Sequence, residues 1–374
     1  MEHILFVIDT LQVGGAETSI LEITSRFKKY TPVICTLFSK KPDLKDKFEE
    51  RGIKVIELNL SGRLWLIEGI RKFRAVLKEQ RPTIVHSLLF KAELLARLAM
   101  GKSNIHIGSF VNDSYTEVRY RNQSFVKNMK LNVYRYIDSI TARNVSCFTS
   151  ITKAVAETNG AKLHIDRNKI HTIYRGRSIE KFEVNHPPLA QKPFLFIVVA
   201  RLLKRKGYME LVQAAKLIAA KRHDFKISVA GEGHDGKLIE QSVQQEGLEK
   251  YFEFLGRRQD VPELLKDAHC FVFPSHYEGQ GGALIEAMLA GKPIVATKID
   301  VFEEQIKDYE SGVLFELQNV KDLADKMLWV MEHYAEAKHM GIRARALAES
   351  RFDIIQIAQQ HEDLYTEIIA KSRR

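Results

Sequence analysis

Residues 271–297 read FVFPSHYEGQGGALIEAMLAGKPIVAT, and this stretch decides the fold predicted for the chain. It opens with an apolar run that ends at Pro274 and continues through a glycine-rich turn into a segment with helical spacing. A second, β-branched run follows Gly291 and Pro293. Strand, glycine-rich turn, helix and strand in this order are typical of a βαβ unit. We therefore predict an α/β domain in this part of the chain.

Two glutamates, Glu278 and Glu286, flank the seven residues that hold most of the turn's glycines. Backbone amides at a glycine-rich helix start are free to face an anion, and the helix dipole favours an anion there. A carboxylate on each side of that anion site suits hydroxyl groups. Phosphate flanked by hydroxyl groups describes a nucleotide sugar, although an ordinary βαβ turn with two solvated glutamates has the same pattern.

The segment resembles the E-x7-E region of the retaining GT-B glycosyltransferases of family GT4, which are related to glycogen synthase and sucrose synthase. The family's EGFG-type and EAMA-G-PV-type runs correspond to residues 278–281 and 286–293. Gln280 replaces the usual aromatic residue, and Gly282 stands where a larger residue is common. The resemblance implies that Glu278 binds hydroxyls of the donor sugar and Glu286 the ribose. It also implies donor-binding residues at the helix start: Gly281, Gly282, Ala283 and Leu284.

A second segment, VVARLLKRKGYMELVQAA at residues 198–215, places Arg201 and Lys206 just after an apolar strand. Negative charge builds on a nucleoside diphosphate as it leaves a sugar, and fixed cations stabilise that charge best in a partly dehydrated site. No metal ion or other cofactor is then required. The segment resembles the family's G-R-L-x-x-x-K-G pattern, although a solvated basic loop is the simpler interpretation of the lysines and arginines in isolation.

Two further segments fall in series with these. VAGEGHDGKLIEQ at residues 229–241 contains Gly231 and Gly233, which resemble the family's G-x-G turn against the nucleotide. FLGRRQDVPELL at residues 254–265 stands where the family's backbone recognises the base. Arg257 is our candidate for a contact with the base or a phosphate there, with Arg258 and plain surface charge as alternatives.

The first apolar strand is followed by Gly14 and Gly15. Their amides are candidate hydrogen-bond donors to a phosphate or a reacting oxygen. They resemble the family's first glycine-rich loop, which lies over the donor phosphates and the acceptor, so the resemblance makes both glycines candidate donor-binding residues. Dinucleotide sites also use the first turn, but they need the spacing G-x-G-x-x-G. The sequence V-G-G-A-E lacks that spacing, so a dehydrogenase is disfavoured.

Candidate acceptor-binding residues follow from the resemblance. His86 matches a strand that ends near the acceptor, although a lone histidine is more often structural. Asn112 and Asp113 stand where relatives often carry His-Asp or His-Glu, which leaves Asp113 as a candidate catalytic residue and Asn112 as a candidate acceptor contact. Arg175 and Arg177 replace neutral residues of a P-N-G-V-D-type turn, and suit a phosphate-bearing acceptor or an ion pair with nearby glutamates.

Alternation of strands and helices runs through most of the 374 residues, which suggests two domains of ordinary size. The best linker candidates are the proline-containing stretches 185–188 and 191–193. We predict an acceptor-binding domain at 1–185, a nucleotide-sugar-binding domain at 186–352 and a C-terminal helix at 353–374. The resemblance implies a GT-B fold, in which two doubly wound, Rossmann-like domains face each other across a cleft and the C-terminal helix crosses back to the first.

Composition limits where the protein acts. Cys35, Cys147 and Cys270 lie in apolar surroundings, and their spacing fits neither a metal site nor a disulfide framework. No signal peptide and no apolar run of about 18 residues is visible. We therefore expect a cytoplasmic protein whose contact with a membrane, if any, is peripheral.

The net charge of +10 is unevenly distributed. Residues 1–185 carry 31 Lys and Arg against 19 Asp and Glu, whereas the remainder carries 26 against 28. Within the first half, residues 119–136 (RYRNQSFVKNMKLNVYRY) mix basic and aromatic residues. That composition suits a helix lying on anionic lipid at the inner face of the membrane, or an amphipathic helix that covers the first sheet.

The matches from Gly14 to Glu286 occur in the family's order, which predicts a retaining glycosyltransferase. We expect it to move a hexose or N-acetylhexosamine from a nucleotide sugar, by family frequency a UDP-sugar, to a hydroxyl of a lipid-linked glycan or of a lipopolysaccharide, capsule or O-antigen precursor. A GT-B nucleotide-sugar 2-epimerase is the alternative. A basic nucleic-acid-binding protein is a remote third, because no nucleic-acid motif is present.

Overall fold

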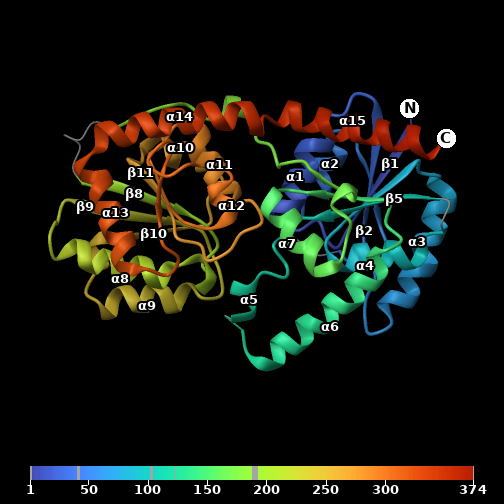
Figure 1. Cartoon of the computed structure of the whole chain (residues 1–374), viewed down its shortest axis with the longest axis horizontal. Helices are drawn as coiled ribbons and strands as arrows, with labels where there is room; N and C mark the ends of the chain where they lie inside the picture. The colour runs from blue at the N-terminus through green and yellow to red at the C-terminus, as the bar shows by residue number, and fades with distance from the viewer. Residues whose placement is uncertain (1, 40–42, 102–103, 122, 188–192, 374) are drawn as a thin grey trace. The chain divides into compact units, whose positions relative to one another are not determined.

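The computed structural model describes residues 2–39, 43–101, 104–121, 123–187 and 193–373. The chain divides into two compact units, each built on one parallel sheet (Figure 1). Unit 1 comprises Met1–Gly176 and Ile354–Arg374, and unit 2 comprises Arg177–Asp353. The predicted α/β architecture with two doubly wound domains is confirmed.

The division falls after Gly176, whereas the sequence placed the boundary after residue 185. The reason is that the segment before the prolines packs onto unit 2. The Lys292 ammonium donates to the Asn185 carbonyl at 2.5 Å, and Arg345 donates to the Phe182 carbonyl at 2.9 Å. Of the two predicted linker stretches, residues 188, 191 and 192 lie outside the described residues.

Unit 1 holds a sheet of seven parallel strands in the order β3-β2-β1-β4-β5-β6-β7. Strand order therefore reverses between β1 and β4. Its strands are β1 (Glu2–Ile8), β2 (Tyr30–Thr36), β3 (Lys54–Glu57), β4 (Ile84–Leu88), β5 (Ile105–Phe110), β6 (Cys147–Ser150) and β7 (Ile170–Thr172). Its helices are α1 (Gly15–Thr24), α2 (Lys45–Glu49), α3 (Trp65–Gln80), α4 (Phe90–Ala99), α5 (Glu117–Arg121), α6 (Phe125–Ala142), α7 (Lys153–Leu163) and α15 (Ile354–Ser372).

The apolar run of β1 supplies both faces of this sheet. Ile4, Phe6 and Ile8 belong to one buried cluster, and Leu5 and Val7 belong to another. This alternation follows from the two-residue period of a strand, and a strand covered on both faces must be apolar throughout.

Helix α15 is held on unit 1 by polar groups as well as by packing. The buried Glu362 carboxylate accepts hydrogen bonds from the backbone amides of Lys28, Lys29 and Tyr30 at 2.8, 2.6 and 3.3 Å. Tyr365 packs in the core beside β4. The C-terminal helix therefore belongs to unit 1, although 177 residues of unit 2 precede it in the chain.

Unit 2 repeats the same strand order with six parallel strands, β10-β9-β8-β11-β12-β13. The order reverses between β8 and β11. The strands are β8 (Phe194–Val199), β9 (Phe225–Ala230), β10 (Phe252–Gly256), β11 (Cys270–Phe273), β12 (Ile294–Thr297) and β13 (Val313–Phe315). The helices are α8 (Tyr208–Ala219), α9 (Gly236–Gln245), α10 (Val261–Asp267), α11 (Gly282–Leu289), α12 (Asp300–Glu303), α13 (Val320–Glu332) and α14 (Tyr334–Phe352).

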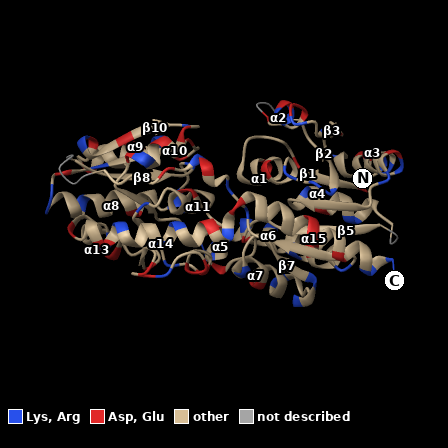
Figure 2. Ribbon diagram, turned by 90° about the horizontal axis from the view of Figure 1, so that it is seen from above, with Lys and Arg blue, Asp and Glu red and all other residues tan. Residues whose placement is uncertain are grey.

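Basic and acidic residues are interspersed along the helices of both units (Figure 2). None of the helices in the described ranges combines the length and apolar composition that a bilayer span requires. The basic and aromatic stretch 119–136 divides between α5 and α6.

Candidate functional site

The loops after β8 and β11 meet at the point where the strand order of unit 2 reverses. In open α/β sheets, ligands bind at this reversal, outside the carboxyl ends of the strands. A 3₁₀ turn, Lys204–Lys206, follows β8, and Gly207 ends it with φ +74°. A Cβ at Gly207 would overlap the Pro274 carbonyl at the end of β11. Glycine is therefore required for the two loops to approach each other.

Lys206 and Glu278 form an ion pair across these two loops. Their side chains are only 9% and 11% exposed, so the pair is largely withdrawn from water. Burial lowers the pKa of Lys206 although Glu278 attracts its proton. Burial acts to raise the pKa of Glu278, but Lys206 and Arg205 outweigh it, and that pKa lies below its usual value. The predicted cation and the predicted sugar-binding carboxylate thus lie in direct contact.

The loop that carries Glu278 is fixed from both sides. The His276 amide donates to the Arg205 carbonyl at 2.9 Å, and the His276 ring lies 2.9 Å from the Glu210 carboxylate. Gln280, which replaces the family's aromatic residue, is 2% exposed. A loop anchored in this way needs little rearrangement to hold a charged group in place.

Helix α11 starts after this loop. Gly281 adopts φ +74° before it, and a Cβ there would press on the rings of Phe302 and Phe273. The first intrahelical bond starts at the Leu284 amide, which donates to the Gly281 carbonyl at 2.9 Å. The amides of Gly282 and Ala283 precede that bond, and the Leu284 side chain is fully buried. A contact between Leu284 and the donor stays a prediction.

Glu286, one turn into α11, is paired with Arg177. The Arg177 Nε lies 2.7 Å from Glu286 Oε1. The sequence assigned Arg177 to the acceptor, but in the structure its side chain pairs with a residue that the sequence assigned to the donor.

The remaining predicted donor residues surround the same loops. A Cβ at Gly231 would overlap the Ala200 carbonyl, and a Cβ at Gly233 would overlap the Leu202 carbonyl, so this turn packs directly on the segment after β8. Arg201 is exposed beside it. Arg257 is also exposed, after β10. Neighbouring Arg258, the alternative to Arg257, forms an exposed ion pair with Asp260 at 2.5 Å.

In unit 1, Gly14 and Gly15 begin α1 after β1. A Cβ at Gly15 would lie 3.3 Å from an Arg175 Nη, so the guanidinium rests against the start of this helix. The Arg175 side chain also donates to the Val111 carbonyl at 3.4 Å. The predicted anion-binding glycines and the predicted acceptor-binding arginine are thus brought together within unit 1.

His86 lies in the middle of β4. It is 1% exposed, and its Nδ1 lies 2.7 Å from the Tyr365 hydroxyl of α15. Its Nε2 lies 2.8 Å from Ser109 Oγ. Both ring nitrogens are therefore engaged inside unit 1, and burial holds the His86 pKa well below its usual value. These contacts suit the structural role that a lone histidine more often has, and a contact between His86 and the acceptor stays a prediction.

A pocket of about 450 Å³ opens in unit 1 at the carboxyl ends of β1 and β5. Asn112 lines it, whereas half-buried Asp113 is not among the described residues that line it. Asp9 also lines it, and its carboxylate accepts from the Ala92 amide at 2.8 Å. Burial raises the pKa of Asp9 to about 6. Aromatic and aliphatic walls come from α3, α4 and α6: Trp65, Phe90, Leu94, Leu131 and Tyr134.

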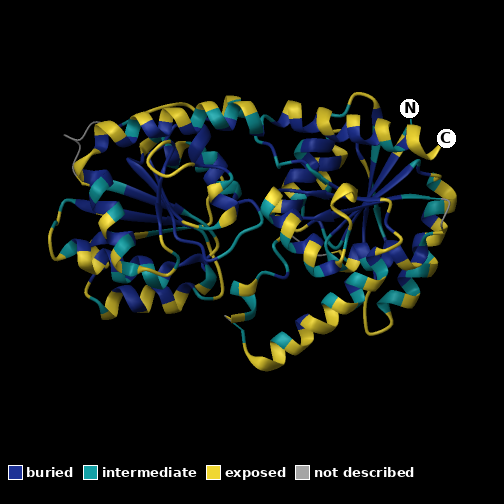
Figure 3. Ribbon diagram, viewed as in Figure 1, coloured by how far each residue is buried: buried dark blue, intermediate teal, exposed yellow. Residues whose placement is uncertain are grey.

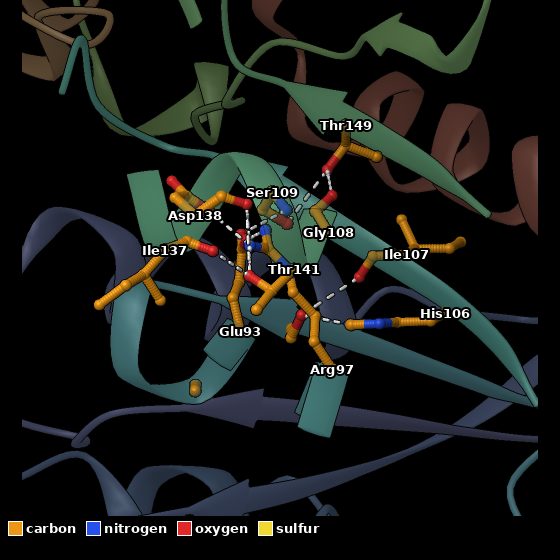
Figure 4. Close-up of polar contacts among 12 residues, drawn as sticks. Glu93, Arg97, His106, Ile107, Gly108, Ser109, Ile137, Asp138, Thr141 and Thr149 are labelled. Atoms are coloured by element: carbon orange, nitrogen blue, oxygen red, sulfur yellow. Dashed lines mark hydrogen bonds and ion pairs between the residues drawn. The ribbon is translucent and has the colours of Figure 1, made fainter. Parts of the chain in front are cut away.

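Glu93 and Asp138, which line this pocket, belong to a buried charge network (Figure 4). Arg97 of α4 pairs with Glu93 of the same helix and with Asp138 of α6. The Ser109 amide donates to Glu93 at 2.8 Å, and the Tyr115 hydroxyl donates to Asp138 at 2.7 Å. Each carboxylate therefore has two partners within unit 1. The network joins α4, α6 and the end of β5 at the wall of the pocket.

Sequence reasoning missed Asp9 and this network. Asp9 carried a signal, since it is the first acidic residue after a buried strand, and Glu93 and Arg97 are spaced as an i, i+4 pair. Asp138 carried none. Among the described residues, no three His, Cys, Asp or Glu side chains are grouped so that they could hold a metal ion.

Two family models match consecutive parts of the chain. One, described as Glycosyltransferase Family 4, matches residues 13–181, and the other, Glycosyl transferases group 1, matches residues 180–347. A relative from Escherichia coli, UDP-Gal:alpha-D-GlcNAc-diphosphoundecaprenol alpha-1,3-galactosyltransferase, is 26% identical over 79% of this chain and 78% of its own length. The capsular polysaccharide biosynthesis glycosyltransferase CapM from Staphylococcus aureus is 24% identical over 82% of each chain.

Solved structures share the fold. Sucrose-phosphate synthase from Thermosynechococcus elongatus superposes with a TM-score of 0.85 at 18% identity, covering 99% of this chain and 100% of the other. HepE from Anabaena, in complex with UDP, superposes with a TM-score of 0.81 at 20% identity over 98% and 100%. The predicted GT-B fold class is confirmed by these likenesses. Since the two family models together extend from residue 13 to residue 347, the chain belongs to the GT4-type, group 1 glycosyltransferases.

Proposed function

We propose that this glycosyltransferase moves a hexose or N-acetylhexosamine from a UDP-sugar to a hydroxyl of a lipid-linked glycan or related cell-surface polysaccharide precursor. The main support for the proposed donor-binding site is the buried pair of Lys206 and Glu278, at the point where the strand order of unit 2 reverses. It puts a cation and a hydroxyl-binding carboxylate side by side, next to the start of α11. The choice of uridine is supported by relatives whose names specify UDP.

Retention of configuration is part of the proposal. The bond between the anomeric carbon and the donor phosphate breaks, and the electron pair leaves with the diphosphate. The acceptor oxygen forms its bond to the anomeric carbon on the same face and gives its proton to the departing phosphate oxygen. Lys206 and Arg201 stabilise the charge on the diphosphate, so this route needs no metal ion.

Glu278 and Glu286 hold the two ends of the donor. Glu278 binds hydroxyls of the sugar, and Glu286 binds the ribose. The amides of Gly282 and Ala283 face the phosphates, because an anion at a helix start is favoured by unbonded amides and by the helix dipole. Gly231 and Gly233 allow the donor to approach the backbone near Arg201, and Arg257 contacts the base or a phosphate.

The pocket of unit 1 is the proposed acceptor site. Its volume of about 450 Å³ is within the ordinary range for small-ligand pockets. Aromatic walls suit the faces of sugar rings, and Asp9 and Asn112 suit their hydroxyls. Gly14, Gly15 and Arg175 then receive a phosphate-bearing part of the acceptor. Asp113 stays a candidate catalytic residue only through its proximity to Asn112.

Helix α6 supplies the proposed contact with the membrane. Four of its apolar residues form what we call the α6 apolar patch: Phe125, Val126, Met129 and Val133. They are 54–79% exposed, and most of α6 is exposed (Figure 3). Exposed Lys127 and Lys130 lie on the same helix. Exposed apolar side chains next to cations suit the headgroup region of an anionic bilayer. A protein placed in this way works at the cytoplasmic face of the membrane, where lipid-linked precursors are extended.

Nucleotide binding tests the donor half. UDP at about 100 times its Kd is expected to raise the free energy of unfolding by about 2.7 kcal/mol, with smaller effects from GDP and ADP. Glu286→Ala should abolish most of this stabilisation, whereas Glu240→Ala, on an exposed face of α9, should leave it unchanged. If none of these nucleotides stabilises the wild type, the proposed donor site is wrong. Formation of epimerised UDP-sugar in the absence of acceptor would favour the 2-epimerase. The relatives named above are transferases and do not support that alternative.

Vesicle binding tests the membrane half. We expect the protein to sediment with vesicles containing a third phosphatidylglycerol, and Phe125→Ser with Met129→Ser to remove most of this binding. Ile342→Ser is the control, because Ile342 is 49% exposed on α14 of unit 2. Equal sedimentation of all three proteins would show that the α6 apolar patch does not contact lipid.

A further inference from the structure

We propose that Arg177 is a positioning residue of the donor site, which holds the Glu286 carboxylate in the orientation that the ribose requires, and that Gly282 is glycine to make room for it. This inference rests on the proposed function, because it deepens the donor site described above. The sequence alone does not connect the two residues, because they lie 105 positions apart and depart from the family pattern in two separate motifs.

The pair between Arg177 and Glu286 is partly dehydrated. Arg177 Nε lies 2.7 Å from Glu286 Oε1, and the two side chains are 21% and 20% exposed. A charge-assisted hydrogen bond of this length, in a site partly closed to water, orients its carboxylate more firmly than an exposed pair does. The pair uses Oε1, which presents Oε2 at a defined angle to a ribose hydroxyl.

The backbone of Arg177 is itself fixed on unit 2. Its amide donates to the Phe352 carbonyl at 2.8 Å, and the residue forms a bridge with Asp353. The guanidinium therefore reaches Glu286 from an anchored main chain at the end of α14. A group held in this way has little freedom left to lose when the donor binds.

Gly282 completes the arrangement. A Cβ built on Gly282 would overlap an Arg177 Nη. A side chain at this position would require the end of the guanidinium to move away from the start of α11. The large residue at position 177 thus occupies the volume that the missing side chain at position 282 leaves open.

Charge gives a second reason for the pair. Glu286 on its own would place a negative charge close to a bound diphosphate, and the two would repel each other. The permanent charge of Arg177 offsets that of Glu286, because a guanidinium stays protonated under all ordinary conditions. Arg177 thereby allows one carboxylate to serve the ribose without weakening the hold on the phosphates.

A double-mutant cycle tests the inference. We would measure the Kd of UDP by calorimetry for Arg177→Gln, Gly282→Ala and the double variant, together with KM for the donor and kcat. Each single variant is expected to raise the Kd and the donor KM about tenfold, with kcat changed less. The double variant should also lose only about tenfold in affinity for UDP. An alanine at position 282 acts by displacing the Arg177 guanidinium, and in the double variant that guanidinium is already absent.

Arg222→Gln is the matched control. The Arg222 Nη2 lies 2.8 Å from Asp224 Oδ2, with the two side chains 34% and 28% exposed, so a partly exposed arginine–carboxylate pair of similar length is removed from the same unit. It should lower the thermal stability of the apo protein but leave the Kd of UDP unchanged. A merely structural role for Arg177 would make the two variants behave alike, and that result would overturn the proposal.

Other outcomes are equally decisive. Tighter binding of UDP by Arg177→Gln would show that Arg177 competes with the ribose for Glu286. A loss of about a hundredfold in affinity for UDP in the double variant would show that Gly282 acts independently of Arg177. A wild type that binds none of UDP, GDP and ADP would overturn the proposed function together with this inference, whereas normal binding by both single variants would overturn the inference alone.

Discussion

The two sheets have the same strand order around their points of reversal, but they place charge differently. In unit 2, the loops after β8 and β11 carry Lys206 and Glu278 to the carboxyl edge of the sheet, where they pair beside a glycine-rich helix start. In unit 1, the corresponding loops after β1 and β4 carry Asp9 and the apolar pair Leu89 and Phe90. One fold therefore produces a charged site and a largely apolar pocket, because the residues at strand ends are not needed for the core.

The origin of the charge pairs differs as well. The pair in unit 2 joins two recognisable motifs. The network in unit 1 lies at the wall of the pocket, and it joins Arg97 to a residue 41 positions away whose local sequence carries no signal. The first arrangement is suited to stabilising a charge that develops during a reaction. The second holds two helices and a pocket wall in place.

The largest expected effect concerns the network in unit 1. Arg97→Met removes the single cation between Glu93 and Asp138, and a buried charge left without its partner costs about 3–5 kcal/mol. Urea unfolding of a Trp329→Phe background, in which Trp65 reports on unit 1, would measure the loss. Arg121→Met is the control, because that side chain is 80% exposed and its pair is worth under about 1 kcal/mol. If Arg97→Met lowers the free energy of unfolding by as little as Arg121→Met does, the network does not stabilise the pocket wall.

The next effect concerns the charged edge of unit 2. Lys206→Met is expected to lower kcat by about 10²–10³, since the lost cation would have stabilised the departing diphosphate. Lys204→Met, an exposed lysine of the same 3₁₀ turn, should change kcat little. The measurement is steady-state transfer from the UDP-sugar identified by nucleotide binding. If both variants lose the same activity, the contrast between buried and solvated cations in this turn is wrong.

Asp9 gives the pocket of unit 1 a pH dependence. Burial raises its pKa from 3.8 in the unfolded chain to about 6. Between these values the folded protein keeps a proton that the unfolded chain has released, so the free energy of unfolding falls as pH rises from about 4 to 6. The contribution of Asp9 to this fall is at most about 3 kcal/mol, at 1.36 kcal/mol per pKa unit.

Asp9→Asn removes this titration. In the Trp329→Phe background, the difference in unfolding free energy between Asp9→Asn and the parent should therefore grow in favour of the variant as pH rises through that window. A difference that stays constant from pH 4 to pH 7 would show that the Asp9 carboxyl is as well solvated as in the unfolded chain.

The smallest expected effect concerns the membrane contact of unit 1. Lys130→Gln should weaken binding to anionic vesicles by about 1 kcal/mol, and the weakening should shrink as salt is raised. Lys226→Gln, an exposed lysine of β9 in unit 2, should change it less. Equal losses from both lysines would show that net charge, and not α6, governs the attraction.

Much of unit 2 was readable from the chain. The strand, glycine-rich turn and helix at 271–289 were correctly located, and Lys206 and Glu278 came together because both stand at the ends of neighbouring parallel strands. Unit 1 was less readable. His86 matched a pattern for an acceptor contact, but α15 returns to cover it, and the fate of a single polar side chain depends on such distant packing.

The sequence by itself determined the two α/β units, the family and the glycines at the turns, because strand period, helix period and backbone conformation are local properties of the chain. Only the tertiary structure decided that Arg177 pairs with Glu286 and that Arg97 pairs with Asp138. These two contacts join residues far apart in the chain. Burying a charge is costly unless the charge is paired, so folding brings each of these side chains next to an opposite charge. No local sequence pattern indicates which residue that partner is.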